Sequence, residues 1–379
     1  MNNAKRQSVR FVAASVAVAA LAVTILPRAS AQDLAVERSK VLRVIGQTKD
    51  VDLPLFPIAD TVGLVFQQEI VEPGAEGLRI HFEITRSGEA WGVQIKDAAG
   101  EVEWSTWDNE VGGDDFWSDE IAGDKLTVEV HSSRPSNLLQ LTIDKIAVVK
   151  PEVTPVSITG VNQLASIVGQ DDWIMDLGGS VARLRFVGDD GGVYVCTAFL
   201  VTSDLVLTNQ HCIASQSEME SALVDFDYLE EGVIGRTLRF SELLETDHTL
   251  DYSVVRLSQC VGRTPLELET THPGDDEQLL IIQHPAGEPK QVSIADCTVD
   301  GPLVEGRGGT DTDMGHQCDT KGGSSGSPVF QFNSRRVVAL HHLGINPASG
   351  NLFNRAAHID LILDDMDPAV RAEIEEGQW

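Results

Sequence analysis

A stretch rich in glycine and serine carries a candidate nucleophile. It reads Gly322-Gly-Ser-Ser-Gly-Ser-Pro328, with Ser325 at its centre. A serine hydroxyl attacks a carbonyl carbon effectively only when a base within hydrogen-bond reach takes its proton. The reaction also needs backbone N–H groups aimed at the developing oxyanion, and flanking glycines allow the tight backbone that this requires. Most such stretches are only loops, so the pattern predicts a nucleophile only if its partners occur elsewhere in the chain.

Two further residues offer the base and the acid that such a serine would need. His211 follows an apolar, strand-like run and stands directly before Cys212, and histidine suits proton transfer near neutral pH. Asp251 opens the apolar run 252–257, where its carboxylate could be buried against an imidazole N–H. Taken singly, the histidine could be structural and the aspartate could cap a turn. Together with the serine they predict a nucleophile, a general base and an orienting acid.

The order His, Asp, Ser resembles that of the chymotrypsin-like (trypsin-like) serine peptidases. Three runs resemble more closely the bacterial subgroup that includes the glutamyl endopeptidases. They are the opening run 167–173, the connecting run 281–285 and the nucleophile loop 323–328. The resemblance covers about residues 160–365 and implies a double β-barrel with peptidase activity.

The resemblance also implies a role for each site residue. Ser325 would attack the scissile carbonyl, His211 would accept and return the proton, and Asp251 would orient the imidazole. The N–H groups of Gly323 and Ser325 would form the oxyanion hole. No cofactor and no metal is implied. Ser324 stands where many animal family members carry an aspartate that pairs with a new N-terminal amine, so that route of activation is not expected.

Cysteine placement fits the same family. The resemblance implies two disulfides, Cys196–Cys212 around the histidine loop and Cys297–Cys318 beside the nucleophile loop. Cys260 is then left over, and we expect it to be a buried free thiol.

Residues that would line the specificity pocket give conflicting indications. Asp319 matches the position that makes trypsin-like relatives prefer Lys or Arg, unless its carboxylate bonds to backbone and points away. Thr320 and His341 match positions with which glutamyl endopeptidases hold an acidic side chain. The formal net charge of −30 attracts basic substrates over long range. The preferred cleavage site is therefore left open, with charge favouring a basic residue.

Outside the motifs, the chain divides into a signal peptide and two β-rich regions. Residues 1–31 combine a cationic start, an apolar run and an Ala-Ser-Ala cleavage pattern, typical of a signal peptide. Alternating runs separated by turn residues predict an antiparallel β-sandwich over 32–150, with 32–60 as a leader or edge segment. A proline-containing linker is expected over 151–160 and the peptidase domain over 161–379. The predicted fold class is all-β, with helices only after Cys212 and over 356–366.

Two features of the sandwich region have alternative interpretations. The acidic run 108–120 could bind Ca²⁺ or could be a solvated turn, and it lacks the ligand spacing of a known calcium loop. Four tryptophans could form a carbohydrate-stacking platform or could pack in the core; they are Trp91, Trp104, Trp107 and Trp117.

Composition limits the partners. So acidic a surface repels nucleic acid and anionic membranes, although the charge could equally serve solubility. We expect a secreted or periplasmic protein that acts on proteins or peptides, with no stable membrane association after signal cleavage; a retained N-terminal anchor is the alternative. A catalytically inactive binding or adhesion module is the alternative function, and an esterase is disfavoured because the elbow-then-histidine order is absent. Oligomeric state, and whether 32–150 is a removable propeptide or a retained domain, stay open.

Overall fold

The computed structural model describes residues 43–55, 62–86, 89–135, 139–150, 156–158, 160–345 and 353–378. Its regular structure is mostly β-strand, which confirms the all-β class, with a sandwich followed by a double β-barrel and C-terminal helices. The predicted signal peptide and most of the predicted linker lie outside the described residues. The division into domains stays a prediction. None of the helices in these ranges has the length and apolarity that crossing a membrane requires.

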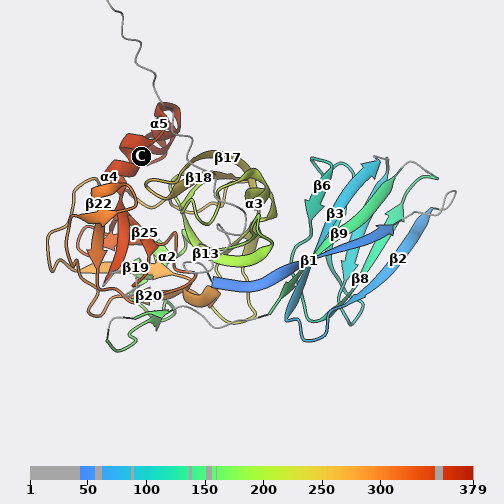
Figure 1. Cartoon of the computed structure of the whole chain (residues 1–379), viewed down its shortest axis with the longest axis horizontal. Helices are drawn as coiled ribbons and strands as arrows, with labels where there is room; N and C mark the ends of the chain where they lie inside the picture. The colour runs from blue at the N-terminus through green and yellow to red at the C-terminus, as the bar shows by residue number, and fades with distance from the viewer. Residues whose placement is uncertain are drawn as a thin grey trace, which may run out of the picture.

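The N-terminal part is a sandwich of two antiparallel sheets (Figure 1). One sheet has the order β2-β8-β4-β5, with bounds Gly63–Val71, Lys125–Ser132, Trp91–Lys96 and Val102–Trp107. The facing strands are β1 (Arg43–Leu55), β9 (Gln140–Val149), β3 (Gly77–Arg86), β6 (Asp115–Trp117) and β7 (Ile121–Ala122). Inward-facing side chains from both sheets form one apolar core, as period-two alternation predicts.

Strand β1 joins the sandwich to the first barrel. It pairs with β9 from Gly46 to Leu55 and with strand β13 of the barrel from Arg43 to Gln47. The predicted edge segment is confirmed in part: from Thr48 to Leu55, β1 pairs with β9 alone, whereas at Gly46 and Gln47 it lies between β9 and β13. Charged residues and Pro54 along the strand hide its apolar alternation, which is confined to Val51, Leu53 and Leu55.

Two barrels follow the sandwich. The first contains β12 (Val181–Val187), β13 (Gly192–Leu200), β14 (Leu205–Thr208), β15 (Leu223–Phe226), β16 (Arg236–Leu238), β17 (Phe240–Asp247) and β18 (Tyr252–Leu257). The second contains β11 (Ala165–Ser166), β20 (Gln291–Ser293), β19 (Leu279–Gln283), β24 (Pro328–Gln331), β25 (Arg336–Leu343), β26 (Asn354–His358), β22 (Gly309–His316) and β21 (Val304–Gly306), in sheet order. A small ladder pairs β10 (Val156–Ser157) with β23 (Thr320–Lys321). One apolar core runs between the two barrels and fixes how they face each other.

Helices are short and lie at the barrel margins. They are α2 (Asp172–Gly178), α3 (Gln216–Ser221), the 3₁₀ turn η1 (Pro285–Gly287), α4 (Ile359–Asp365) and α5 (Pro368–Gly377). Helix α3 confirms the expected turn after Cys212. The helix predicted over 356–366 is confirmed as α4, except that residues 356–358 belong to β26. Pro368 begins α5 rather than ending a helix, since Asp367 caps its N-terminus. The opening strand expected near 167–173 is not present there: β11 ends at Ser166, residues 167–171 form a turn, and α2 begins at Asp172.

Two arginines of the first barrel, the buried Arg185 and the partly exposed Arg239, form ion pairs with the sandwich. Arg185 pairs with Asp225 inside the barrel and with Glu120 of the sandwich, at 2.8 and 2.6 Å. Arg239 pairs in the same way with Asp119. The last residues of the acidic run therefore make ion pairs across the junction instead of forming only a solvated turn.

The tryptophans support core packing more than a binding platform. Trp91 and Trp117 are buried, and Trp104 packs against the sandwich core. Trp107 is 38% exposed and covers Gly92, where a Cβ would lie 2.7 Å from its ring.

Asp225 gives a test of the barrel's charged core. Its carboxylate is fully buried between Arg183 and Arg185. We expect Asp225→Ala to lower the free energy of unfolding by about 3–5 kcal/mol, because two guanidinium groups then lose their buried counter-charge. Urea unfolding at pH 7 measures this. Asp364→Ala, which removes an exposed pair with Arg371, is the control and should leave the urea midpoint nearly unchanged, because solvent screens exposed ion pairs. Equal losses would contradict the account.

Candidate active site

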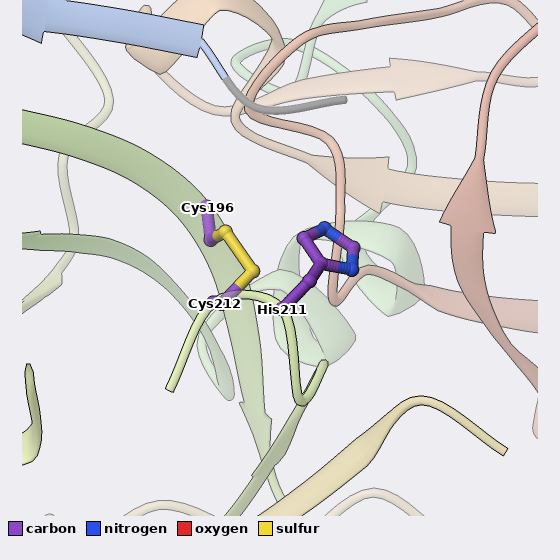
Figure 2. Close-up of side chains that lie close together, drawn as sticks. All are labelled: Cys196, His211 and Cys212. Atoms are coloured by element: carbon purple, nitrogen blue, oxygen red, sulfur yellow. A yellow bond between two sulfur atoms is a disulfide. The ribbon is translucent and has the colours of Figure 1, made fainter. Parts of the chain in front are cut away.

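The histidine loop is fixed by a disulfide. Strand β14 ends at Thr208, and the loop that follows carries His211 and Cys212. Cys212 is bonded to Cys196 on β13, and Figure 2 shows the imidazole of His211 beside this bridge. The bridge therefore holds the histidine against a central strand of the first barrel.

Asp251 lies where β18 begins and contacts His211 twice. Its Oδ2 lies 2.8 Å from His211 Nδ1, and its Oδ1 accepts the backbone N–H of His211 at 3.0 Å. Its backbone is left-handed with φ of 57°, and Asn209 Nδ2 donates to its carbonyl at 2.9 Å. The double contact fixes both the position of the imidazole and the nitrogen that carries its proton, because Nδ1 must donate to the carboxylate.

Burial sets the charge states of this pair. Burial alone would raise the pKa of Asp251, but His211, His342 and Arg307 hold that pKa well below its ordinary value. Burial lowers the pKa of His211, and its effect outweighs the attraction of Asp251. The arrangement therefore pairs an ionised carboxylate with a neutral imidazole, which is the state that a general base needs.

The loop that carries Ser325 is tied to the same strand as the histidine. Thr197 donates from its backbone N–H to Ser325 O at 2.7 Å and from Oγ1 to Gly323 O at 2.9 Å. Thr197 directly follows Cys196, whose disulfide partner Cys212 adjoins His211. These contacts bring the nucleophile loop and the histidine loop to one place on β13.

Within the described residues no hydrogen bond joins Ser325 Oγ to His211 Nε2, and that nitrogen is buried without a partner. Such bonds are often long in the absence of substrate and tighten when it binds. A buried polar atom without a hydrogen-bond partner costs stability, so its presence calls for an explanation. His211 Nε2 is free to accept a proton from a hydroxyl.

The expected oxyanion donors lie in a strained turn. Gly323 has φ of 100°, and a Cβ there would lie 2.9 Å from His284 O, so only glycine fits. In the part of the chain that the structure describes, the N–H groups of Gly323 and Ser325 have no acceptor. Ser324 is buried, and its Oγ accepts the N–H of Lys321. The turn thus leaves two neighbouring amides free.

The expected pocket residues differ in what they contact. Asp319 Oδ2 accepts the backbone N–H of Gln163 at 2.7 Å, which matches the alternative in which this carboxylate bonds to backbone. His341 exchanges backbone hydrogen bonds with the residues that follow Ser325, so it flanks the nucleophile loop. Thr320 is buried on β23, next to Asp319.

Three charged residues that lie beside Asp251 were not predicted from the sequence. His342 Nδ1 lies 3.1 Å from Asp251 Oδ2, and its Nε2 lies 2.7 Å from Asp313 Oδ2. Arg307 lies 3.2 Å from the same oxygen of Asp251. The only sequence signal was the doubled histidine 341–342, because β22 and β25 are far apart along the chain.

Among the residues that the structure describes, two groups of side chains could be considered for a metal. In the group Cys196, His211 and Cys212, the sulfurs are joined as a disulfide and supply no thiolate. In the group His272, His358 and Asp360, the two imidazoles stack 3.9 Å apart and nearly parallel. Ligating nitrogens point along their ring planes, so stacked rings do not converge on one ion. Neither group is arranged to hold a metal.

The structure contains both disulfides that the resemblance implies. They are Cys196–Cys212 and Cys297–Cys318. Cys260 is free but exposed, so the expectation of a buried thiol is corrected. It follows β18 in a surface segment outside both barrel cores.

Comparisons with known proteins give three kinds of match. Two curated relatives match: the secreted RxLR effector protein 73 of Plasmopara viticola, 31% identical over 183 residues, and the uncharacterized protein y4fB of Sinorhizobium fredii, 32% identical over 167 residues. The matches cover 44% and 39% of this chain, and the chain spans only 45% and 25% of those relatives.

Solved structures of serine proteases are similar at a low level. The active form of the Rv3671c protease of M. tuberculosis has 15% identity and a TM-score of 0.40, over 56% of this chain and 89% of that chain. The thermostable serine protease AL20 of an extremophilic microorganism has 18% identity and a TM-score of 0.37, over 48% and 91%. Scores this low add nothing to the strand pairing described above.

One family model matches the chain directly. It is the trypsin-like peptidase domain, which matches residues 196–340. This span holds His211, Asp251 and Ser325, whose motifs carry the resemblance. Residues 196–340 therefore belong to the chymotrypsin-like (trypsin-like) serine peptidase family.

Proposed function

We propose that this protein is a secreted serine endopeptidase that uses Ser325, His211 and Asp251 as its catalytic triad. One observation carries the proposal: a buried Asp251–His211 pair, 2.8 Å apart, adjoins the loop that carries Ser325. A binding protein would gain nothing from a buried ionised carboxylate that orients an imidazole with an unused nitrogen.

The chemistry follows from this geometry. His211 Nε2 takes the proton of Ser325 Oγ as that oxygen attacks the scissile carbonyl. Asp251 keeps the other imidazole proton on Nδ1 and stabilises the imidazolium that forms. The free amides of Gly323 and Ser325 bind the oxyanion, and the loss of one such donor typically costs about 3–4 kcal/mol. The imidazolium then protonates the leaving amine, and water releases the acyl group by the same steps.

Export of the protein is part of the proposal. The signal-like pattern over 1–31 and two disulfides support a secreted or periplasmic location, because disulfides persist mainly in oxidising compartments. The sandwich is proposed as an accessory domain that positions substrate.

We further propose that the enzyme prefers glutamate before the cleaved bond, as in the glutamyl endopeptidases. The contact between Asp319 and Gln163 engages the carboxylate that would otherwise attract a basic side chain. His341 flanks the nucleophile loop, and His316 supports its ring at 3.1 Å. The acidic surface favours basic substrates instead, but salt screens this long-range attraction beyond about 8 Å under physiological conditions.

A second candidate is an inactive trypsin-fold protein that binds partners through its sandwich. The missing hydrogen bond between Ser325 and His211 favours it, as does a pocket at the junction. That pocket is lined by Trp104 and Trp117 of the sandwich and by Arg239 of the barrel.

A fluorophosphonate probe tests the triad. The probe should label Ser325 in the wild-type protein, because the hydroxyl is activated by its base. Ser325→Ala should abolish labelling, and His211→Ala should slow it by about a thousandfold or more. Intact-mass and peptide analysis measure both. His131→Gln, a histidine of the sandwich, is the control and should label normally. A wild-type protein that is folded but unlabelled would favour the second candidate.

The pH profile tests the state of the base. Because burial lowers the pKa of His211 below its ordinary 6.5, the imidazole stays neutral as the pH falls through that value. Activity should therefore persist at pH 6.5 and fall only at lower pH. The acid limb of kcat/KM for a peptide substrate measures this. A midpoint above pH 6.5 would show that the base is not the desolvated imidazole described here.

Matched peptides test the cleavage preference. Peptides that differ only in carrying Glu or Lys before the cleaved bond should compete in favour of Glu. Thr320→Val, which removes a hydroxyl at nearly constant volume, should lower kcat/KM for the Glu peptide by about tenfold, the cost of one hydrogen bond to a charged group. Preferred cleavage after Lys or Arg would contradict the pocket assignment and leave the triad untouched.

A further inference from the structure

A second histidine contacts the carboxylate oxygen that accepts the hydrogen bond from His211 Nδ1–H. His342 Nδ1 lies 3.1 Å from Asp251 Oδ2, and Nε2 lies 2.7 Å from Asp313 Oδ2. All three side chains are essentially inaccessible to water. Each nitrogen of the ring therefore faces a carboxylate and has no alternative partner.

Hydrogen-bond chemistry fixes the charge of this ring. A neutral imidazole has one N–H donor and one lone pair, whereas an imidazolium donates from both nitrogens. In the neutral form a lone pair of His342 would face a buried carboxylate oxygen at hydrogen-bond distance. Burial would lower the pKa of His342, but its hydrogen bonds to Asp251 and Asp313 raise that pKa to about 9. The ring is thus an imidazolium between two aspartates at neutral pH.

The titratable and charged groups around His342 come from several elements. They are Asp251 before β18, Asp313 and His316 on β22, Arg307 between β21 and β22, His211 after β14, and His341 on β25. Burial lowers the pKa of His316 to about 3 and holds the pKa of His341 well below its ordinary value. These two rings are neutral, which leaves His342 and Arg307 as the cations that face the two aspartates.

We propose that His342, held as an imidazolium by Asp313, is a positioning residue that fixes the carboxylate of Asp251 and keeps His211 a neutral base in acid. The inference rests on the proposed peptidase function and extends the triad by two residues. Neither His342 nor Asp313 touches the reacting atoms.

The effect on His211 follows from a shared oxygen. The Nδ1 atoms of His211 and His342 both bond to Asp251 Oδ2 and so lie within about 6 Å of each other, close enough for strong coupling between charges. A proton on His211 would place two cations on one carboxylate. The charge on His342 therefore opposes protonation of the base when the pH falls, while both rings hold the carboxylate in place.

Asp313→Asn isolates the charge from the geometry. The amide has nearly the same shape, and its NH₂ group can donate to a neutral His342 Nε2 while Nδ1 still donates to Asp251. We expect the acid limb of kcat/KM to move up by about one pH unit, because His211 is then protonated more easily. Activity at pH 5.5 should fall several-fold, while the value on the plateau near neutral pH stays within about twofold.

Two further variants locate the effect. His342→Gln removes the same charge and should move the acid limb in the same direction. The double variant His342→Gln, Asp313→Asn should have its acid limb at the same pH as His342→Gln alone, because Asp313 acts only through His342. Asp311→Asn is the control: it removes an exposed carboxylate two residues away on β22 and should leave the limb where it is.

Histidine NMR reads the charge without catalysis. In protein labelled with ¹⁵N-histidine, His342 should carry protons on both nitrogens at pH 7 and lose one near pH 9; in Asp313→Asn it should be neutral at pH 7. A neutral His342 in the wild-type protein overturns the inference. So does an acid limb that moves in neither Asp313→Asn nor His342→Gln. Failure of the peptidase proposal looks different: the wild-type protein would hydrolyse no peptide at any pH.

Discussion

The buried negative charge of Asp251 is the constraint on which the site depends. A carboxylate without access to water is tolerable only if donors surround it. The first barrel supplies His211, by ring and backbone, and the second barrel supplies His342 and Arg307. The charge thus ties the two barrels together at the place where substrate would bind. Satisfying this one carboxylate also fixes the tautomer of the base.

Strand β13 organises the rest of the molecule. Its backbone holds the nucleophile loop through Thr197, and its Cys196 anchors the histidine loop. At its other end it pairs with β1, which continues into the sandwich. The sandwich is therefore hydrogen-bonded directly to the strand that carries Cys196 and Thr197. Pairing of β1 with β13 thus connects the sandwich to the strand beside the site. Ion pairs such as Arg185–Glu120 stabilise the same junction.

The all-β fold and the candidate site residues could be predicted from the sequence because their signals are local. The proposed triad residues sit in motifs whose neighbours are local: glycines beside Ser325, a cysteine beside His211, an apolar run after Asp251. Strand β1 was predicted only as a leader or edge segment because charges and Pro54 interrupt its alternation. Helix α5 was not predicted because Pro368 can end one helix or begin another. Asp313 and His342 form their contact only through pairing of distant strands, so no local pattern could reveal it.

A structure of the protein treated with a peptidyl phosphonate tests the central claim most directly. The account predicts a covalent bond from Ser325 Oγ to phosphorus, with one phosphonyl oxygen on the N–H groups of Gly323 and Ser325 and with His211 Nε2 within hydrogen-bond distance of the adduct. An adduct at another residue would contradict it. So would a bound phosphonyl oxygen that points away from those two amides.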